Sequence, residues 1–521
     1  MTQNPDQLST SQQNQPLEDR VNNRSMKPNS EAFKEFMGSN WAASEEDATT
    51  RLASADFAAE RRAKLSARFP GERLVIPAGP LKVRSNDCDY RFRPHSGFAH
   101  MTGLGQDHEP DAVLVLEPVE PGEGDNGSGH KATLYFRPMA GRDTAEFYSD
   151  ARSGEFWIGT RPTLDVLSTM TGIPTAHMDL ELEDAITANA GNPALNGLSI
   201  RLVRGADETV DAVVDTSRYN TGVDLEQADS LDGELTEALS ELRLTKDAWE
   251  IEQLRAAVDA TANGFDNVIA SLPRAIDHKR GERVVEGAFF ARAREEGNDL
   301  GYETIAAAGN HATILHWIRN EGQVNTGDLL LVDAGVEADS LYTADVTRTL
   351  PVDGTFTEVQ ARVYQAVLDA ADAAFAIVKP GITFRTVHET ALKVLAENLA
   401  SWGILPVSVE EAISPEGQQH RRWMPHGTSH HLGLDVHDCA QARQELYQDG
   451  IVEEGMVFTI EPGLYFKAED LAIPAEYRSI GVRIEDDILV TAEGAERLTS
   501  EIPRTIPEVE AWMARVAARS L

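Results

Sequence analysis

Cysteine is scarce in this sequence, which contains only Cys88 and Cys439. Two cysteines so far apart do not form the disulfide framework that stabilises many small secreted domains. Their scarcity favours a reducing compartment, and we expect a cytoplasmic protein.

Basic residues are also few in comparison with acidic ones. The chain has 47 Lys and Arg against 85 Asp and Glu, a formal net charge of -38 at pH 7. Such a charge opposes extended contact with nucleic acid or with an anionic membrane surface. We interpret the excess as a solubility feature that assigns no partner.

Long hydrophobic runs are missing as well. The sequence has no stretch of about 18 apolar residues that could span a bilayer. The first 30 residues lack the apolar core of a signal peptide. We therefore expect neither membrane insertion nor secretion.

Three regions follow one another along the chain. Residues 1–50 are rich in Gln, Asn, Ser and Asp and poor in large apolar side chains, which predicts a disordered polar tail. Residues 51–243 alternate between helix-like and strand-like segments and form a predicted α/β domain. Long amphipathic patterns begin near residue 244, so residues 244–521 form a second predicted domain.

Hydrophobic periodicity places the main elements of both domains. In the first domain we predict a helix at 54–66 and strands at 73–76, 112–116 and 132–136. In the second, helices are predicted at about 251–272, 284–296, 357–378 and 384–402. The first of these ends at Pro273 in the prediction, and Thr357 with Gln360 has capping-box spacing. The order of two helices and an acidic strand pair occurs twice.

An acidic hairpin lies at the centre of the second domain. Residues 329–332 and 341–349 read as two strands around a polar turn, with Asp333 closing the first and Asp345 inside the second. Pairing would bring the two carboxylates together on a buried face. Two ionised carboxylates repel each other in a low dielectric unless a cation lies between them, so the hairpin indicates a metal.

Further candidate ligands follow in the second half of this domain. Glu461 and Glu485 again flank a polar connection, and His430 precedes them. Four carboxylates and one imidazole suit a hard or borderline divalent ion, with manganese favoured and cobalt, zinc or iron as alternatives. Because four carboxylates carry the charge that two divalent cations neutralise, we expect two ions.

Five segments of the second domain resemble one metallopeptidase family, which contains aminopeptidase P, prolidase and methionine aminopeptidase. The segments are residues 332–335, 343–349, 426–438, 459–465 and 481–490. The resemblance covers about residues 60–515 and implies a pita-bread α/β catalytic domain with pseudo-two-fold halves. A creatinase-like α/β domain would precede it.

The resemblance also implies how the metal would be held. Asp345 and Glu485 match the ligands that bridge two ions, Asp333 matches a ligand of one ion, and His430 with Glu461 completes the other. His431 directly follows His430 and could compete for the metal, but the register of the motif favours His430.

Catalytic roles follow from the same resemblance. His316, His426 and His437 match histidines that orient the substrate and stabilise the tetrahedral intermediate, and Glu461 matches a proton shuttle. Arg483 is expected to brace a ligand carboxylate. Two divalent ions would activate a water molecule for hydrolysis.

The function implied is that of an Xaa-Pro aminopeptidase, acting on peptides with proline at the second position. Prolidase, which cleaves Xaa-Pro dipeptides, is the alternative, and a non-catalytic binding member of the fold is less favoured because all five ligands are present. We also expect a homo-oligomer, a dimer or a tetramer.

Overall fold

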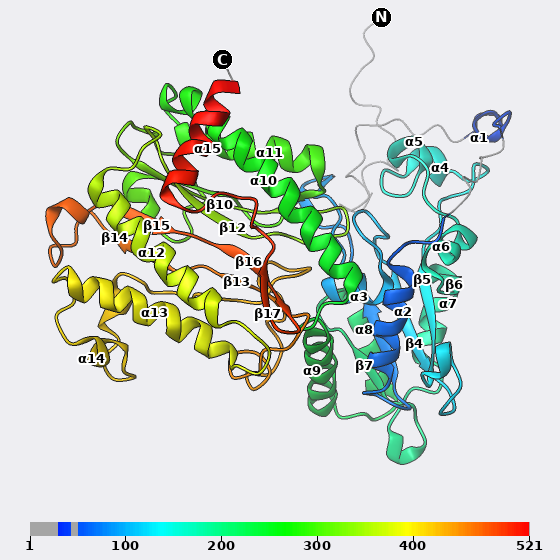
Figure 1. Ribbon diagram of the computed structural model, residues 1–521. Coiled ribbons are helices and arrows are strands. Elements are labelled where there is room, and N and C mark those ends of the chain that lie inside the picture. The colour runs from blue at the N-terminus through cyan, green and yellow to red at the C-terminus, as the bar shows by residue number, and fades with distance from the viewer. Residues whose placement is uncertain (1–29, 43–49, 520–521) are drawn as a thin grey trace, which may run out of the picture. The chain divides into compact units, whose positions relative to one another are not determined.

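The computed structural model describes residues 30–42 and 50–519 (Figure 1). It divides into two compact units. The first contains the described residues up to Ala59 together with Phe69–Asp232, and the second contains Glu60–Arg68 and the described residues from Gly233 onward. None of the helices in the described part of the chain is long and apolar enough to cross a membrane.

One segment of the predicted disordered tail is helical in the structure. Residues 1–29 and 43–49 lie outside the described residues, but Glu31–Gly38 form helix α1. The ring of Phe33 in this helix packs edge-on against Tyr148 of the same unit, at 5.4 Å between centroids. The prediction was wrong there because a few aromatic side chains suffice to dock a short helix in a polar segment.

The first unit is built on a mixed five-stranded sheet in the order β6-β5-β4-β1-β7. Strand β4 is antiparallel to β1 and β5, whereas β1 pairs in parallel with β7 and β5 with β6. The predicted strands are confirmed. The strands are β1 (Arg73–Pro77), β4 (Val113–Pro118), β5 (His130–Phe136), β6 (Thr175–His177) and β7 (Ile200–Leu202), with a separate pair β2 (Val83–Ser85) and β3 (Cys88–Asp89).

Short helices accompany this sheet. The buried valines of β1 and β4 form one core cluster with apolar residues of α7 and α8. The predicted helix at 54–66 is confirmed as α2. The helices of this part of the chain are α2 (Ala55–Ser66), α3 (Ser96–Thr102), α4 (Glu146–Ser149), α5 (Glu155–Ile158), α6 (Leu164–Thr171), α7 (Met178–Thr187), α8 (Glu208–Asn220) and α9 (Leu225–Leu242), of which α2 and α9 have residues in both units.

The second unit has the predicted helices with one correction. Helix α10 passes through Pro273, where we expected it to end, and stops at Ile276. Pro273 lies in the last turn, so the missing N–H removes little of the hydrogen bonding. The capping box of Thr357 and Gln360 is present. The helices are α10 (Ala248–Ile276), α11 (Gly281–Glu296), α12 (Glu358–Ile377), α13 (Phe384–Ser401), α14 (Val409–Ile413) and α15 (Ile506–Arg519).

Two three-stranded sheets, β12-β10-β9 and β13-β16-β17, lie between the helix pairs α10–α11 and α12–α13 in Figure 1. Two-stranded pairs β14-β15 and β11-β8 accompany them. The predicted repeat of two helices and a strand pair is therefore confirmed. The strands are β8 (Asp299–Leu300), β9 (Ile305–Ala308), β10 (Leu329–Ala334), β11 (Val336–Glu337), β12 (Val346–Pro351), β13 (Val457–Ile460), β14 (Gly463–Phe466), β15 (Ile480–Arg483), β16 (Asp486–Thr491) and β17 (Gly494–Arg497).

The acidic hairpin forms as predicted, apart from the position of one acid. Strands β10 and β12 pair antiparallel, with Asp333 opposite Thr347. Asp345 lies immediately before β12 and not inside it, because its backbone N–H donates to Asp487 Oδ2 at 3.2 Å. The Glu485 N–H donates to the Thr347 carbonyl at 3.1 Å, which joins the hairpin to the chain between β15 and β16.

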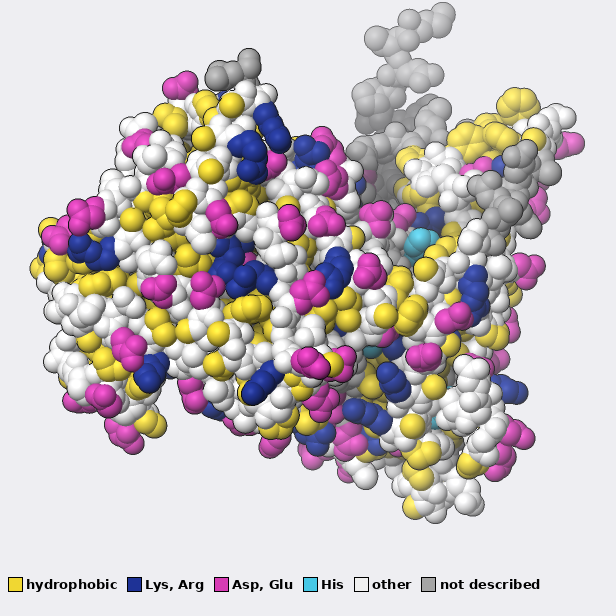
Figure 2. All heavy atoms as spheres, in the orientation of Figure 1, with side chains coloured by type: hydrophobic (Ala, Val, Ile, Leu, Met, Phe, Trp, Pro, Cys, Tyr) yellow, Lys and Arg dark blue, Asp and Glu magenta, His cyan; other side chains and the backbone are white. Residues whose placement is uncertain are grey.

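Acidic side chains are scattered over the surface. On the face shown in Figure 2, Asp and Glu are interspersed with Lys and Arg and do not gather in one patch. This distribution agrees with a general solubility role for the excess charge.

A buried ion cluster connects the segment between α9 and α10 to the loop after His430. Asp438 accepts hydrogen bonds from Arg243 Nε at 2.8 Å and from Lys246 Nζ at 3.1 Å, and its own N–H donates to the His431 carbonyl at 2.9 Å. Burial alone would raise the pKa of Asp438, but the two cations outweigh it and hold that pKa well below its ordinary value. The cluster therefore fixes the loop that carries His437.

We expect Asp438→Asn to destabilise the second unit by about 3–5 kcal/mol, because it leaves two buried cations without their anion. Since the folded-state pKa of Asp438 is depressed, its contribution is present above the unfolded pKa of about 3.9 and is lost as pH falls below it. Thermal unfolding between pH 3 and 7 should show a weaker acid dependence in the variant. Asp449→Asn, which removes an exposed ion pair with Arg385, is the control and should change little. Equal unfolding temperatures of Asp438→Asn and wild type at pH 7 would contradict this account.

Candidate metal centre and active site

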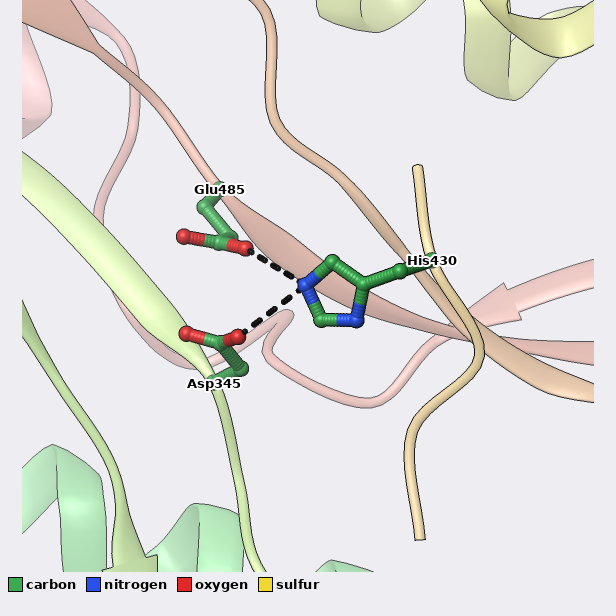
Figure 3. Close-up of side chains that lie close together, drawn as sticks. All are labelled: Asp345, His430 and Glu485. Carbon is green, nitrogen blue, oxygen red and sulfur yellow. Dashed lines mark ion pairs between the residues drawn. The ribbon is translucent and has the colours of Figure 1, made fainter. Parts of the chain in front are cut away.

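Four carboxylates and one imidazole meet where the strand pairs of the second unit come together. Asp333 is in β10, Asp345 precedes β12, Glu461 follows β13, and Glu485 lies between β15 and β16. Figure 3 shows the carboxylates of Asp345 and Glu485 directed at the His430 ring. His430 Nε2 lies 3.3 Å from Asp345 Oδ2, 3.7 Å from Glu461 Oε1 and 3.9 Å from Glu485 Oε1.

These five residues line one cavity of about 490 Å³. Within the described residues, Asp345, His430 and Glu485 offer ligand atoms that all lie within 4.8 Å of one another. The three other histidines singled out from the sequence line the same cavity. The remaining lining residues are Tyr302, Glu303, Ile305, Leu315, His316, Ile318, His426, Gly427, Ser429, Val436, His437 and Arg483.

Arg483 neutralises part of the negative charge. Its Nη2 contacts Asp333 Oδ2, and its Nε donates to Thr347 Oγ1 at 3.0 Å. Thr347 Oγ1 in turn donates to Glu485 Oε2 at 2.7 Å. Arg483 therefore contacts Asp333 directly and lies 3.9 Å from Glu485 Oε2, which it also steadies through the Thr347 hydroxyl, but one guanidinium does not balance four carboxylates.

The protonation of the site shows this deficit of positive charge. Burial raises the pKa of Glu461 to about 8, and burial with neighbouring Asp345 raises the pKa of Glu485 well above its ordinary value. Burial would lower the pKa of His430, but Asp345 and Glu461 outweigh it and raise that pKa to about 9. The residues thus favour added positive charge, and their oxygen-rich donor set fits divalent cations.

Tyr302 also belongs to the site, although it was not among the residues selected from the sequence. Its hydroxyl oxygen lies 2.6 Å from Asp333 Oδ1 and 2.5 Å from Asp345 Oδ1. A phenol carries one hydrogen, so it can donate to only one of these oxygens at a time. Tyr302 follows the short strand β8, distant in sequence from both acids, and no charge pattern marks it.

Neutral imidazoles form another part of the cavity wall. His426 Nε2 shares a hydrogen bond of 2.7 Å with the Tyr465 hydroxyl, and His426 Nδ1 lies 3.5 Å from Glu461 Oε2. Burial and the nearby Arg483 lower the pKa of His426 to about 3. Burial also lowers the pKa of His437, whose ring stands edge-on to His430 at 4.5 Å. Both rings can therefore donate and accept hydrogen bonds without carrying charge.

His431 points away from the cavity and into the core. Its fully buried ring stacks on Phe384 at 4.8 Å and meets Tyr447 and Phe458 edge-on. Burial lowers the pKa of His431 to about 3. Neighbouring residues of an extended segment face opposite sides, so only His430 reaches the carboxylates.

Two family models match this chain. Residues 252–492 match "Metallopeptidase family M24", and residues 58–194 match "Aminopeptidase P, N-terminal domain". The second match begins after the described α1 and covers most of the first unit. The first covers every candidate ligand described above.

Curated relatives and solved structures resemble nearly the whole chain. Xaa-Pro aminopeptidase 2 of Streptomyces coelicolor is 50% identical over 92% of this chain and 96% of its own length. Xaa-Pro aminopeptidase of Escherichia coli is 32% identical over 90% of this chain and 99% of its own. Proline aminopeptidase P II from Yersinia pestis has a TM-score of 0.71 at 30% identity, covering 88% of this chain and 99% of that structure. The predicted two-part α/β fold is thereby confirmed.

The positions of the two adjacent histidines predict different effects on stability. We expect His431→Ala to destabilise the protein by about 2–5 kcal/mol, the range for large-to-small substitutions in a core. His437→Ala is the control, since His437 belongs to the same loop but lies in the cavity wall, where the residue is partly open to solvent, and not in the core. Thermal unfolding in the presence of a chelator measures both. An unfolding temperature of His431→Ala equal to that of His437→Ala would show that His431 is not a core residue.

Proposed function

The chain belongs to metallopeptidase family M24, and we propose that it is an Xaa-Pro aminopeptidase, which hydrolyses the bond between an amino-terminal residue and a following proline. The observation that carries the proposal is the convergence of four carboxylates, His430 and three further histidines on one cavity. Relatives that are named Xaa-Pro aminopeptidase and align over nearly their whole length support this substrate class. An intact ligand set argues against a non-catalytic binding protein.

Divalent metal ions are the cofactor of this site. We propose two ions, held by Asp333, Asp345, His430, Glu461 and Glu485, with Mn²⁺ as the preferred metal because four of the five donors are carboxylates. The raised pKa values of Glu461 and Glu485 support this, since they reflect burial and neighbouring carboxylates whose effect the protein's own cations do not offset. When bound, such ions lower the pKa of a water molecule and polarise a carbonyl group.

The side chains around the ions would bind and orient the peptide. We assign to His316, His426 and His437 the hydrogen bonds that hold the scissile carbonyl and stabilise the charge that develops on its oxygen. His426 is fixed for this task by the Tyr465 hydroxyl at 2.7 Å. Glu461 is the proposed proton carrier, because it lines the cavity and its Oε2 lies 3.5 Å from His426 Nδ1.

We propose that the protein works in a reducing compartment, the cytoplasm. Both cysteines are free: Cys88 is exposed and Cys439 is buried. An exposed free thiol persists best where disulfides do not form.

Peptide length distinguishes the proposed activity from that of prolidase. We expect metal-dependent release of the first residue from an Xaa-Pro-Yaa tripeptide, with kcat/KM at least roughly tenfold above that for an Xaa-Pro dipeptide or an Xaa-Ala-Yaa tripeptide. Mass spectrometry of the products measures all three. Preference for the dipeptide would replace the proposal with prolidase, and cleavage independent of proline would remove it.

Asp345→Ala should abolish turnover and cut metal content together, because a ligand shared by two ions contributes to both. Elemental analysis and tripeptide hydrolysis on the same preparation give the two readouts. Glu303→Ala is the control, since Glu303 lines the cavity without belonging to the proposed ligand set, and it should keep its metal. Full metal occupancy with near wild-type activity in Asp345→Ala would remove the two-metal interpretation.

A further inference from the structure

Glu282 is a fully buried carboxylate that lies outside the catalytic cavity. It belongs to the first turn of α11. Its Oε1 accepts from the Ala308 N–H at 2.9 Å and lies 2.7 Å from His311 Nδ1. Its Oε2 accepts from Trp317 Nε1 at 2.8 Å and from the Gly322 N–H at 2.6 Å. Each oxygen therefore has two partners.

All of these partners belong to one stretch of chain, from Ala308 to Gly322. Leu315, His316 and Ile318 in its middle line the catalytic cavity. Glu282 thus holds both ends of the stretch. It also holds His311, which precedes the cavity-lining residues, and Trp317, which lies between His316 and Ile318.

The stretch has little regular structure of its own. Its helical content is one 3₁₀ segment, Gly309–Thr313, and the residues that reach the cavity come after it. The rings of His311 and Trp317, which both contact Glu282, stack on each other with 3.8 Å between their centroids. Few backbone hydrogen bonds are available to fix such a segment, which makes the contacts to Glu282 important for its position.

Only a carboxylate satisfies this set of partners. An ionised carboxylate is an acceptor at both oxygens, whereas glutamine would turn an NH₂ group toward two of the donors. Donors left unpaired in a buried place cost free energy, so the segment would shift to find other partners.

We propose that Glu282 is a positioning residue, which sets the place of His316 and its neighbours in the cavity wall without touching the substrate. The inference rests on the proposed function and adds to it a residue outside the cavity on which substrate binding depends. Displacement of a hydrogen-bonding group by about 1 Å can cost on the order of 100-fold in rate.

A double-mutant cycle with His316 tests the proposal. We expect Glu282→Gln to lower kcat/KM for the Xaa-Pro-Yaa tripeptide by roughly 10- to 100-fold, and to lower it by less than about twofold when His316→Ala is already present. The unfolding temperature should instead fall by a similar amount in both backgrounds. An equal loss of kcat/KM in the two backgrounds, or no loss in the folded single variant, would overturn the proposal.

Glu250→Gln is the matched control for the loss of a buried carboxylate. Glu250 is also buried in the first turn of a helix, α10, where it accepts from the Tyr342 hydroxyl at 2.7 Å. Its loss should lower the unfolding temperature without any coupling to His316. If Glu282→Gln does not fold, Trp317→Phe removes a single donor and should give a smaller loss that is likewise masked by His316→Ala.

Hydrogen exchange separates this inference from the proposed activity. In Glu282→Gln, amides of residues 309–322 should exchange faster than in wild type, whereas Glu250→Gln should leave them unchanged. Unchanged exchange in Glu282→Gln would overturn the positioning role even if the enzyme is active. If Glu282→Gln exchanges faster but the wild-type protein does not cleave the tripeptide, the proposed activity is wrong and the anchoring role remains.

Discussion

Electrostatic repulsion among four buried carboxylates is the constraint on which the second unit depends. Asp333 lies in β10, and Asp345, Glu461 and Glu485 lie just outside other strands, yet all four share one cavity with a single guanidinium and one charged imidazole. Folding alone does not supply enough positive charge to keep such a group ionised. The site makes physical sense as a place for divalent cations, which also provide the chemistry of hydrolysis.

Buried charges away from the metal site hold the loops that complete it. Asp438 is satisfied by Arg243 and Lys246 and fixes the loop of His437. Glu282 is satisfied by donors from the stretch that carries His316. In both places a desolvated charge is hydrogen-bonded by the protein itself, and these fixed contacts lie next to a cavity-lining histidine. Burying such groups costs free energy, but their hydrogen bonds hold the loops in precise positions.

Much of the fold could be predicted from the sequence, and the candidate ligands could be selected because they are charged residues near strand ends in segments that resemble one family. The family was predicted from those segments, the repeated order of helices and strands from hydrophobic periodicity, and the capping box from the spacing of Thr357 and Gln360; all three are confirmed. Tyr302 and Glu282 could not be selected, since their roles arise from contacts with residues distant in sequence. The prediction that proline ends the helix also failed at Pro273. Helix α10 continues through it because the loss of one N–H donor in the last turn costs little free energy.

The side chains around the candidate ligands also divide into those that could be predicted from the sequence and those that could not. The alternation of an extended segment predicts opposite directions for His430 and His431, and the structure has one in the cavity and the other against Phe384. The partner of His426, Tyr465, was not predicted, because its hydroxyl reaches the ring only after β14 and β15 have paired. Patterns along the chain therefore predicted the charged groups, whereas the hydrogen bonds that orient them required the folded structure.

The number of metal ions that activity requires tests the account most directly. Metal-free protein would be titrated with Mn²⁺, and bound ions counted by calorimetry while tripeptide hydrolysis is followed in the same samples. The account predicts two ions for each chain, with hydrolysis rising as they bind. Full hydrolysis by metal-free protein, or activity that is already maximal with one bound ion per chain, would contradict it.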